Sequence, residues 1–272
     1  MPKTAAKFET CDPVWSDMRT EATRVVAGEP MLASYLHASV LNHDRFEDAL
    51  SYHLSQKLGS PEMPAMLVRQ VFDEALKADP EIGAAVRADL SAVLDRDPAC
   101  DTTLTPFLYF KGFHALQSYR VAHWLWTHDR KPLALFFQNR ISMAFGVDAH
   151  PAARIGRGIM IDHATGVVIG ETTVIENDVS ILQGVTLGGT GKEHGDRHPK
   201  IREGALIGSG AKILGNVEVG AHSRIGANSV VLKPVPSGCT AAGVPAKIVG
   251  CAGSETPSRD MQHSWPEDAI EQ

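Results

Sequence analysis

A six-residue period of Ile and Val is the feature of this sequence that most restricts its fold. Every sixth residue from Ile155 to Val185, and again from Ile201 to Val231, is Ile or Val, with the single exception of Thr173. A period of six fits neither the two-residue repeat of a flat strand nor the 3.6-residue repeat of a helix. It predicts a chain that turns a corner every six residues, so that stacked coils share one aliphatic core. The two runs together predict four coils of three sides each.

An insertion interrupts this period. Residues 191–200, GKEHGDRHPK, are rich in His, charged residues and Gly, and we expect them to form a loop extruded from the solenoid. Such a loop leaves the stacking of neighbouring coils intact, and loops on rigid scaffolds often carry function. The loop 191–200 is therefore a candidate part of a functional site.

The chain before residue 147 has a different pattern. Its apolar residues recur at helical spacing, and Pro and Gly separate the segments, so residues 1–146 are expected to form an all-helical domain. Residues 147–250 are expected to form the solenoid domain, and the polar residues 251–272 a flexible tail. The predicted fold class is α+β, with a helical domain followed by a parallel β-helix.

Composition excludes several classes of protein. Lys and Arg number 26 against 32 Asp and Glu, a formal net charge of −6, which argues against a general nucleic-acid binder. No apolar run approaches the roughly 20 residues of a membrane helix, and the first residues do not resemble a signal peptide. The cysteines, Cys11, Cys100, Cys239 and Cys251, show no paired spacing. We expect free thiols and a cytoplasmic protein.

Several segments resemble the bacterial serine O-acetyltransferases. They are DHATG at 162–166, GDRHPKI at 195–201, AAGVPAKIVG at 241–250, and EPMLASYLHASVLNH and LYFKGFHALQSYRVAHWLW in the helical half. The resemblance covers nearly the whole chain except the C-terminal tail. It implies that the β-helix is left-handed and that the protein forms a homotrimer or a dimer of trimers. The implied reaction transfers acetyl from acetyl-CoA to the hydroxyl of L-serine, the first step of cysteine biosynthesis.

The resemblance also implies the catalytic residues. His163 matches the general base, and an imidazole suits that task because its pKa lies near operating pH. Asp148 matches a carboxylate that orients the imidazole. It precedes His163 by fifteen residues, a little less than one coil of eighteen, so we expect the two to meet on adjacent coils. The structural alternative for Asp148 is a cap on the turn before His150.

Substrate-binding residues follow from the same resemblance. Asp97 and Asp162 match residues that hold serine, whose ammonium group needs an anion. Arg197 and His198 lie in the extruded loop, which in the family reaches a site between subunits, and an arginine can clamp a carboxylate with two hydrogen bonds. His194 and His198 are four residues apart, but no third ligand accompanies them, so we expect no metal.

Acetyl-CoA is expected as a co-substrate, with no permanently bound cofactor. Four residues are candidates for contacts with it, although ordinary turn structure explains each of them equally well: Gly189, Thr190, Ala211 and Lys247. The sequence contains neither GxxxxGK[ST] nor a strand-bound GxGxxG, so no triphosphate or dinucleotide site is expected.

Three other functions compete with this interpretation. They are an acetyltransferase for another amino-acid or sugar hydroxyl, a γ-type carbonic anhydrase with zinc on three histidines, and a non-catalytic scaffold. Asp97, Asp162 and Arg197 together fit a zwitterion better than a neutral sugar, and His163 and His198 have no convincing third histidine. The serine enzyme is the function we predict.

Two further partners follow from the resemblance. L-cysteine differs from L-serine only in sulfur for oxygen, so it is expected to bind the serine site as a feedback inhibitor. Family members that bind cysteine synthase end in Ile with a free carboxylate. Here Glu271 and Gln272 follow Ile270, so we expect weak or absent binding to the synthase, because two polar residues would have to enter an apolar pocket.

Overall fold

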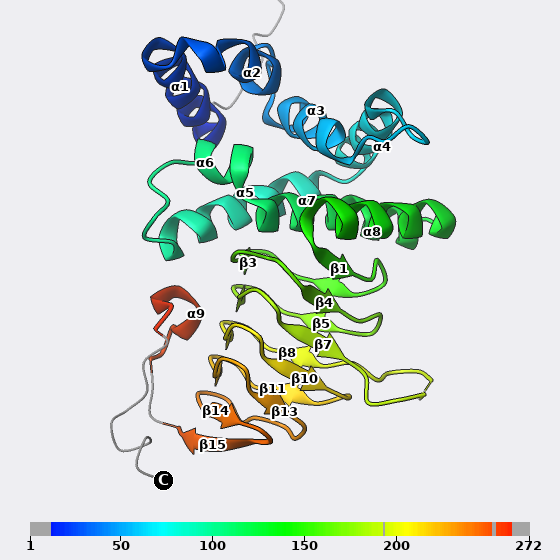
Figure 1. The fold of residues 1–272 in the computed structure, drawn as a ribbon, viewed down its shortest axis with the longest axis vertical. Coiled ribbons are helices and arrows are strands. Elements are labelled where there is room, and N and C mark those ends of the chain that lie inside the picture. The colour runs from blue at the N-terminus through cyan, green and yellow to red at the C-terminus, as the bar shows by residue number, and fades with distance from the viewer. Residues whose placement is uncertain (1–11, 193, 252–253, 263–272) are drawn as a thin grey trace, which may run out of the picture.

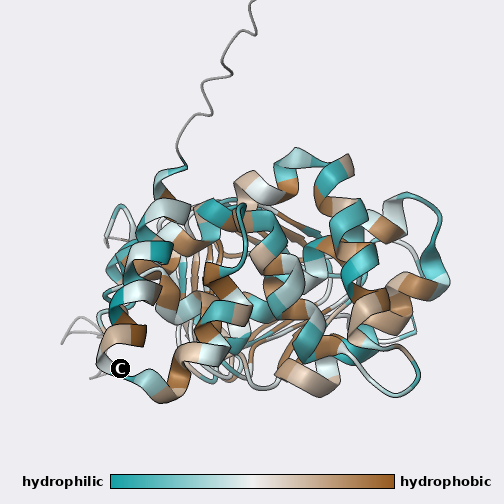
Figure 2. Ribbon diagram, turned by 90° about the horizontal axis from the view of Figure 1, so that it is seen from above, coloured by the Kyte–Doolittle hydropathy of each residue, from teal (hydrophilic) through white to brown (hydrophobic). Residues whose placement is uncertain are grey.

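The computed structural model describes residues 12–192, 194–251 and 254–262. The helices of the N-terminal half lie across one end of a solenoid built by the C-terminal half (Figure 1). Seen from above, they cover that end, with polar and apolar segments alternating along them (Figure 2). Buried side chains of both halves belong to one hydrophobic cluster. The helical layer therefore closes one end of the solenoid.

Local signals set the ends of the helices. Asp12 accepts a hydrogen bond from the amide of Trp15, and Pro13 begins α1, the usual chemistry of a helix N-terminus. Gly146, with φ of 73°, ends α8 in the left-handed conformation. Within the described ranges, no helix is long and apolar enough to cross a bilayer. The helical elements are α1 (Pro13–Gly28), a 3-10 turn (Pro30–Leu32), α2 (Ala33–Leu36), a π-helical turn (His37–Leu41), α3 (Phe46–Leu58), α4 (Ala65–Ala78), α5 (Pro80–Arg96), α6 (Leu104–Tyr109), α7 (Lys111–Thr127), α8 (Lys131–Phe145) and α9 (Pro257–Asp260).

Short strands form the three sides of the solenoid. Sheet A has the order β1-β4-β7-β10-β13, sheet B the order β11-β8-β5-β2, and sheet C the order β15-β14-β12-β9-β6-β3. Neighbouring strands are parallel except for the pair β14 and β15. The strands are β1 (Val147–Ala149), β2 (Arg154–Ile155), β3 (Met160–Ile161), β4 (Val167–Ile169), β5 (Val174–Ile175), β6 (Ser180–Ile181), β7 (Thr186–Gly188), β8 (Lys200–Ile201), β9 (Leu206–Ile207), β10 (Lys212–Leu214), β11 (Glu218–Val219), β12 (Arg224–Ile225), β13 (Val230–Val231), β14 (Thr240–Gly243) and β15 (Ala246–Gly250).

The coil that contains DHATG has two residues more than a regular coil of eighteen. Ile155 stacks on Ile175, twenty residues later, whereas Ile201 stacks on Val219 after only eighteen. The two extra residues fall in the turn at 162–166, so the inward position of the next strand is Ile169 rather than Val167. Both residues are buried, because each side of the coil buries two residues that are two apart. The two extra residues therefore do not interrupt the six-residue period of Ile and Val.

The solenoid has about five coils rather than the predicted four, since sheet A contains five strands. The inward positions continue at both ends, although the last coil has only sixteen residues, with Val235 opposite Val219. Ala149 pairs with Ile169 at the helical end, and Ala241 pairs with Ile225 at the other end. Alanine fills the same inward position with less volume, which hides these coils from a search for Ile and Val.

The expectation of free thiols is wrong for two of the cysteines. Cys239 and Cys251 form a disulfide, while Cys100 is a buried free thiol and Cys11 lies outside the described residues. The antiparallel pairing of β14 with β15 places Thr240 opposite Gly250, so the residues flanking this pair meet. The sequence gives no sign of the pairing because the hairpin itself creates it.

Part of the expected flexible tail is folded against the helical domain. Arg259 forms an ion pair with Asp95 of α5, with Nε 2.8 Å from Oδ2. Met261 packs against the small apolar cluster of Val93, Cys100 and Met160. These partners lie more than 100 residues earlier in the chain, so the local composition of the tail could not reveal them. Residues 263–272, which include Ile270, lie outside the described residues.

Candidate active site

A cavity of about 520 Å³ lies where the helical layer meets the first coil of the solenoid. Three of the predicted residues share its wall: Asp97, which follows α5, and Asp162 and His163, which follow β3. The start of α7 supplies another part of the wall through Lys111 and Gly112. The fold thus brings together residues that are 65 positions apart in the sequence.

The turn after β3 presents His163 to solvent. His163 and Ala164 have φ values of 55° and 61°, a region that residues with side chains seldom occupy. The amide of Ala164 donates to the carbonyl of Asp162 at 2.6 Å, and the amide of Thr165 donates to that of His163 at 2.7 Å. These tight bonds leave the His163 side chain 73% exposed. Backbone strain of this kind is frequent at functional sites.

Two carboxylates share the wall of this cavity with the imidazole. Nε2 of His163 lies 3.5 Å from Oδ2 of Asp162. Oδ1 of Asp97 accepts a hydrogen bond from the amide of Ala99 at 2.9 Å, which orients that carboxylate at the end of α5. Two acidic groups on the wall of one small cavity suit a cation such as an ammonium group.

Arg197 and His198 lie at another corner of the coil, where the chain passes from sheet A to sheet B. Nη2 of Arg197 is 2.6 Å from Oε2 of Glu171. Nδ1 of His198 accepts a hydrogen bond from the amide of Thr172 at 3.1 Å. Burial and the adjacent Arg197 guanidinium lower the pKa of His198. The loop therefore holds an oriented guanidinium beside a neutral imidazole.

Asp148 belongs to this second corner. Oδ1 of Asp148 accepts a hydrogen bond from Nε2 of Gln138 at 2.7 Å. Burial lowers the pKa of the nearby His150, and the carboxylates of Glu171 and Asp148 oppose that shift. Among the hydrogen bonds and ion pairs between described residues, none joins Asp148 to His163. The chain thus presents two separate groups of predicted residues, one on each side of sheet A.

Comparison with known proteins identifies the family. A family model described as "Serine acetyltransferase, N-terminal" matches residues 14–118, and "Bacterial transferase hexapeptide (six repeats)" matches residues 198–233. The serine acetyltransferase of Salmonella typhimurium is 61% identical over 256 residues, which cover 94% of each chain. The chain belongs to the serine acetyltransferase family. The predicted fold, a helical domain followed by a left-handed parallel β-helix, is confirmed.

Two solved structures of serine acetyltransferases have known ligands. One is a complex with cysteine, 58% identical, with a TM-score of 0.91, covering 93% of this chain and 98% of that one. The other is the Brucella abortus enzyme in complex with coenzyme A, 52% identical, with a TM-score of 0.89, covering 91% of this chain and 99% of that one.

The four coenzyme candidates of this serine acetyltransferase are spread along the solenoid. Gly189 and Thr190 follow β7, and Lys247 lies in β15. Ala211 is fully buried. Its amide donates to the carbonyl of Gly208, and its carbonyl accepts from the amide of Thr186. Ala211 can therefore contribute to a ligand site only through the shape of the surface around it.

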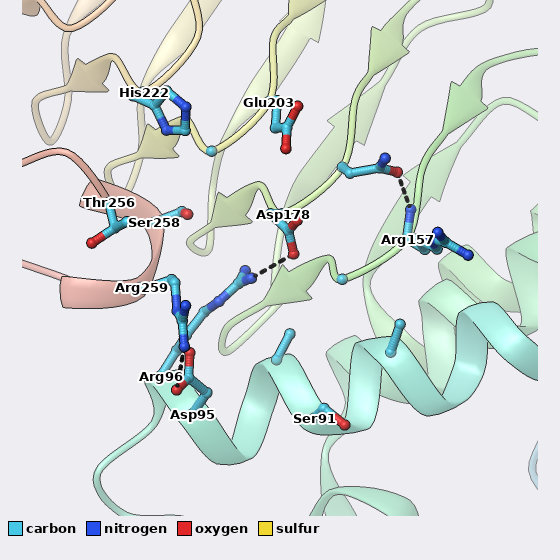
Figure 3. Close-up of a pocket in the computed structure, with 15 residues that line it drawn as sticks. Ser91, Asp95, Arg96, Arg157, Asp178, Glu203, His222, Thr256, Ser258 and Arg259 are labelled. Carbon is cyan, nitrogen blue, oxygen red and sulfur yellow. Dashed lines mark hydrogen bonds and ion pairs between the residues drawn. The ribbon is translucent and has the colours of Figure 1, made fainter.

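A larger cavity, of about 820 Å³, lies between α5, the corner joining sheets B and C, and α9 (Figure 3). Arg96 reaches from α5 to Asp178, with Nη2 3.3 Å from Oδ1. Glu203 and His222 line the solenoid side of the cavity (Figure 3). None of the predicted site residues lines it, and we give it no part in acetyl transfer.

The sequence did not single out Gln138, Glu171 or Thr172, although each contacts a predicted residue. Glu171 and Thr172 follow β4 at a corner, where polar residues are ordinary, so no pattern distinguishes them. Within the described part of the chain, no three side chains of His, Cys, Asp or Glu are arranged to hold a metal ion.

Proposed function

We propose that this serine acetyltransferase transfers the acetyl group of acetyl-CoA to the hydroxyl of L-serine, releasing O-acetylserine and CoA, with His163 as the general base. The observation that carries the proposal is one cavity whose wall holds an exposed imidazole, the carboxylate of Asp162 beside it, and the carboxylate of Asp97. A neutral sugar offers no cation to these carboxylates. The cavity therefore favours an amino acid over a sugar as the acceptor.

His163 supplies the base that the reaction needs. A hydroxyl is a poor nucleophile at neutral pH, so its proton must leave as its oxygen attacks the thioester carbonyl. The new oxygen–carbon bond forms, the carbon–sulfur bond breaks, and the imidazolium returns the proton to the leaving sulfur. The strained turn supports this role because it leaves the ring exposed on the wall of the cavity.

The serine zwitterion requires both groups of predicted residues. Asp97 and Asp162 hold the ammonium, and Arg197 with His198 binds the carboxylate. Because the two groups lie at different corners of one subunit, a complete site needs the second corner of a neighbouring copy. We propose a homotrimer, alone or paired as a dimer of trimers, in which each cavity receives the loop 191–200 of the next subunit.

Asp148 is assigned to the same interface. It lies on the side of sheet A that carries Arg197 and His198. In this arrangement the carboxylate that orients His163 comes from the neighbouring subunit, together with the loop. Such a carboxylate would fix the tautomer of the imidazole and stabilise its protonated form.

Acetyl-CoA is proposed to lie in the groove between subunits, along the solenoid. Gly189 and Thr190 would border its pantetheine arm, and the ammonium of Lys247 would offset phosphate charge. Ala211 keeps the surface shallow where the arm passes. The complex of the Brucella abortus relative with coenzyme A supports a coenzyme site of this kind.

L-cysteine is proposed as a feedback inhibitor that occupies the serine site. It carries the same ammonium and carboxylate groups, and a relative has been solved with cysteine bound. Inhibition by the end product suits an enzyme that commits serine to cysteine biosynthesis, and we propose that this takes place in the cytoplasm.

Release of free CoA thiol from acetyl-CoA measures the activity directly. Serine, homoserine, threonine and a galactoside should be compared as acceptors, and serine should be the best. His163→Ala should lower kcat by roughly 10²- to 10⁴-fold, the usual cost of losing a general base. His222→Ala, an exposed histidine of the larger cavity, is the matched control. Activity of His163→Ala within about two-fold of wild type would contradict the assignment.

A further inference from the structure

A buried carboxylate of α5 holds the strand that leads to His163. Asp89 is fully buried, and its Oδ1 accepts a hydrogen bond from the amide of Ile159 at 2.9 Å. Its Oδ2 accepts from Nη2 of Arg120 at 2.6 Å and from Nε2 of Gln117 at 3.0 Å. A buried charge without partners would be costly. Here both oxygens are bonded.

Arg120 connects the same network to a second point on the coil. Its Nη2 also donates to the carbonyl of Gly156 at 2.8 Å. Asp89 and Arg120 therefore hold the backbone at Gly156 and at Ile159, on both sides of the turn that enters β3. Because Asp89 comes from α5 and Arg120 from α7, one ion pair sets the position of two helices against the coil.

The start of α7 contacts the other end of β3. A Cβ placed on Gly112 would lie 1.9 Å from the carbonyl oxygen of Ile161 and 3.3 Å from Cβ of Ala164. Only glycine allows the helix to approach this closely. Asp162 and His163 follow Ile161 directly, so the helical layer fixes the strand immediately before both.

We propose that Asp89 is a positioning residue that sets the distance between His163 and the bound serine. α5 carries Asp89 in its middle and Asp97 at its C-terminal end, while the strand that Asp89 holds leads to Asp162 and His163. One helix thus connects a carboxylate that binds the ammonium to the base that takes the proton. The inference rests on the proposed function, because it requires those roles for Asp97 and His163.

Asp89→Asn tests the proposal. The variant keeps the volume and one acceptor oxygen, but it turns an amide N–H₂ toward the guanidinium of Arg120. We expect kcat/KM for serine to fall about 10- to 100-fold, because a displacement of about 1 Å at a reacting group has that effect. The KM for acetyl-CoA should change less than about two-fold, since Gly189 and Thr190 lie on a different sheet. The pH profile of kcat/KM should also shift, because the surroundings of His163 change.

Gly112→Ala is an independent test that does not depend on the ion pair. Alanine favours the helix itself, so α7 is not weakened, yet its methyl group must displace the carbonyl of Ile161. We expect the same selective loss for serine. Val68→Ala in α4 is the matched control, because Val68 is fully buried in the helical domain. It should lower thermal stability and leave kcat/KM for serine within about two-fold.

Different outcomes refute the positioning role of Asp89 and the proposed function. The proposal is overturned if folded Asp89→Asn or Gly112→Ala enzyme keeps serine kcat/KM within about two-fold of wild type, or if acetyl-CoA binding weakens as much as serine binding. Should Asp89→Asn fail to fold, Gly112→Ala decides. If the wild-type protein does not acetylate serine, or if His163→Ala is fully active, the proposed function fails instead.

Discussion

Acidification should destabilise this protein through two histidines in the core of the helical domain. His53 and His114 are only 3% and 1% exposed, with ring centroids 5.2 Å apart. Burial lowers the pKa of each to about 3, and in His53 the neighbouring imidazole and Lys57 add to the effect. Nε2 of His114 donates to the carbonyl of Phe107 at 2.8 Å. The folded protein therefore holds both rings neutral.

The direction and size of the effect follow from linkage. In the unfolded chain each histidine titrates near its ordinary pKa of about 6.5. Above that pH both histidines are neutral in the folded and in the unfolded state, so they do not make the free energy of unfolding depend on pH. Below that pH the unfolded state binds a proton on each histidine and the folded state does not. The free energy of unfolding therefore falls by about 1.4 kcal/mol per pH unit for each histidine. Between pH 7 and pH 5 this amounts to about 2 kcal/mol each, or about 4 kcal/mol for the pair. Typical total stabilities are only about 5–15 kcal/mol.

Carboxylates do not account for a loss of stability between pH 7 and pH 5. Burial raises the pKa of Asp89, so its protonation in the folded state opposes that loss as the pH falls. Ion pairing lowers the pKa of Glu171, Glu176 and Asp196. Their contribution to stability is therefore present above their ordinary pKa values and is lost only as the pH falls below about 4.5. The loss of stability between pH 7 and pH 5 should belong mainly to histidines.

Urea unfolding at pH 7, 6 and 5, at one fixed protein concentration, measures the effect. His53→Phe should reduce the difference in unfolding free energy between pH 7 and pH 5 by about 2 kcal/mol, because the His53 ring already stacks on Phe107 and a phenyl ring does not titrate. His222→Gln, at an exposed site, should leave the difference unchanged. A wild-type stability that is flat across this range, or an undiminished slope in His53→Phe, would refute the reasoning.

Three further predictions concern the site and the hairpin. Asp148→Asn should lower kcat by at least about ten-fold, since an amide supports the wrong tautomer; mixing it with inactive His163→Ala subunits and measuring thiol release should recover activity if the two residues act across an interface. Arg197→Ala and Asp97→Ala should each raise the KM for serine and the inhibition constant for cysteine together, and cysteine inhibition that persists undiminished in both would indicate a separate regulatory site. Cys251→Ser should lower the melting temperature, because the disulfide to Cys239 closes a loop and such links contribute about 2–4 kcal/mol; adding reductant should lower the melting temperature of the wild type but not that of the variant.

The repeat made most of the solenoid predictable because it records burial directly. Ile155, Ile161 and their successors are inward-facing residues, so their spacing reports the length of each side. The spacing does not report the two extra residues in the turn at 162–166, because Val167 and Ile169 are both buried. The period does not report the first coil because Ala149 occupies its inward position. It does not report the last coil because that coil has sixteen residues, so Val235 and Ala241 fall out of the six-residue spacing.

The sequence predicts residues of the candidate site only where they lie in a short local motif. His163 and Arg197 lie in short motifs with a clear family resemblance, whereas the network of Asp89, Arg120 and Ile159 joins three distant segments. Nothing in the sequence near Asp89 distinguishes it from an ordinary polar residue of a helix. Its importance follows from burial and from partners that only the folded chain brings together.

The number of coils has a consequence for the ligand as well as for the fold. Stacked strands are spaced by about 4.8 Å, so each coil between His163 at one end of the solenoid and Lys247 at the other lengthens the groove by one fixed step. Because a repeat contacts only its neighbours, a coil could be gained or lost without disturbing the packing of the others. In the proposed complex the thioester would have to reach the imidazole of His163 while the phosphates reached the ammonium of Lys247. With the coenzyme placed in this way, we expect the number of coils to set the length of the acyl donor, so that a donor as long as coenzyme A fits.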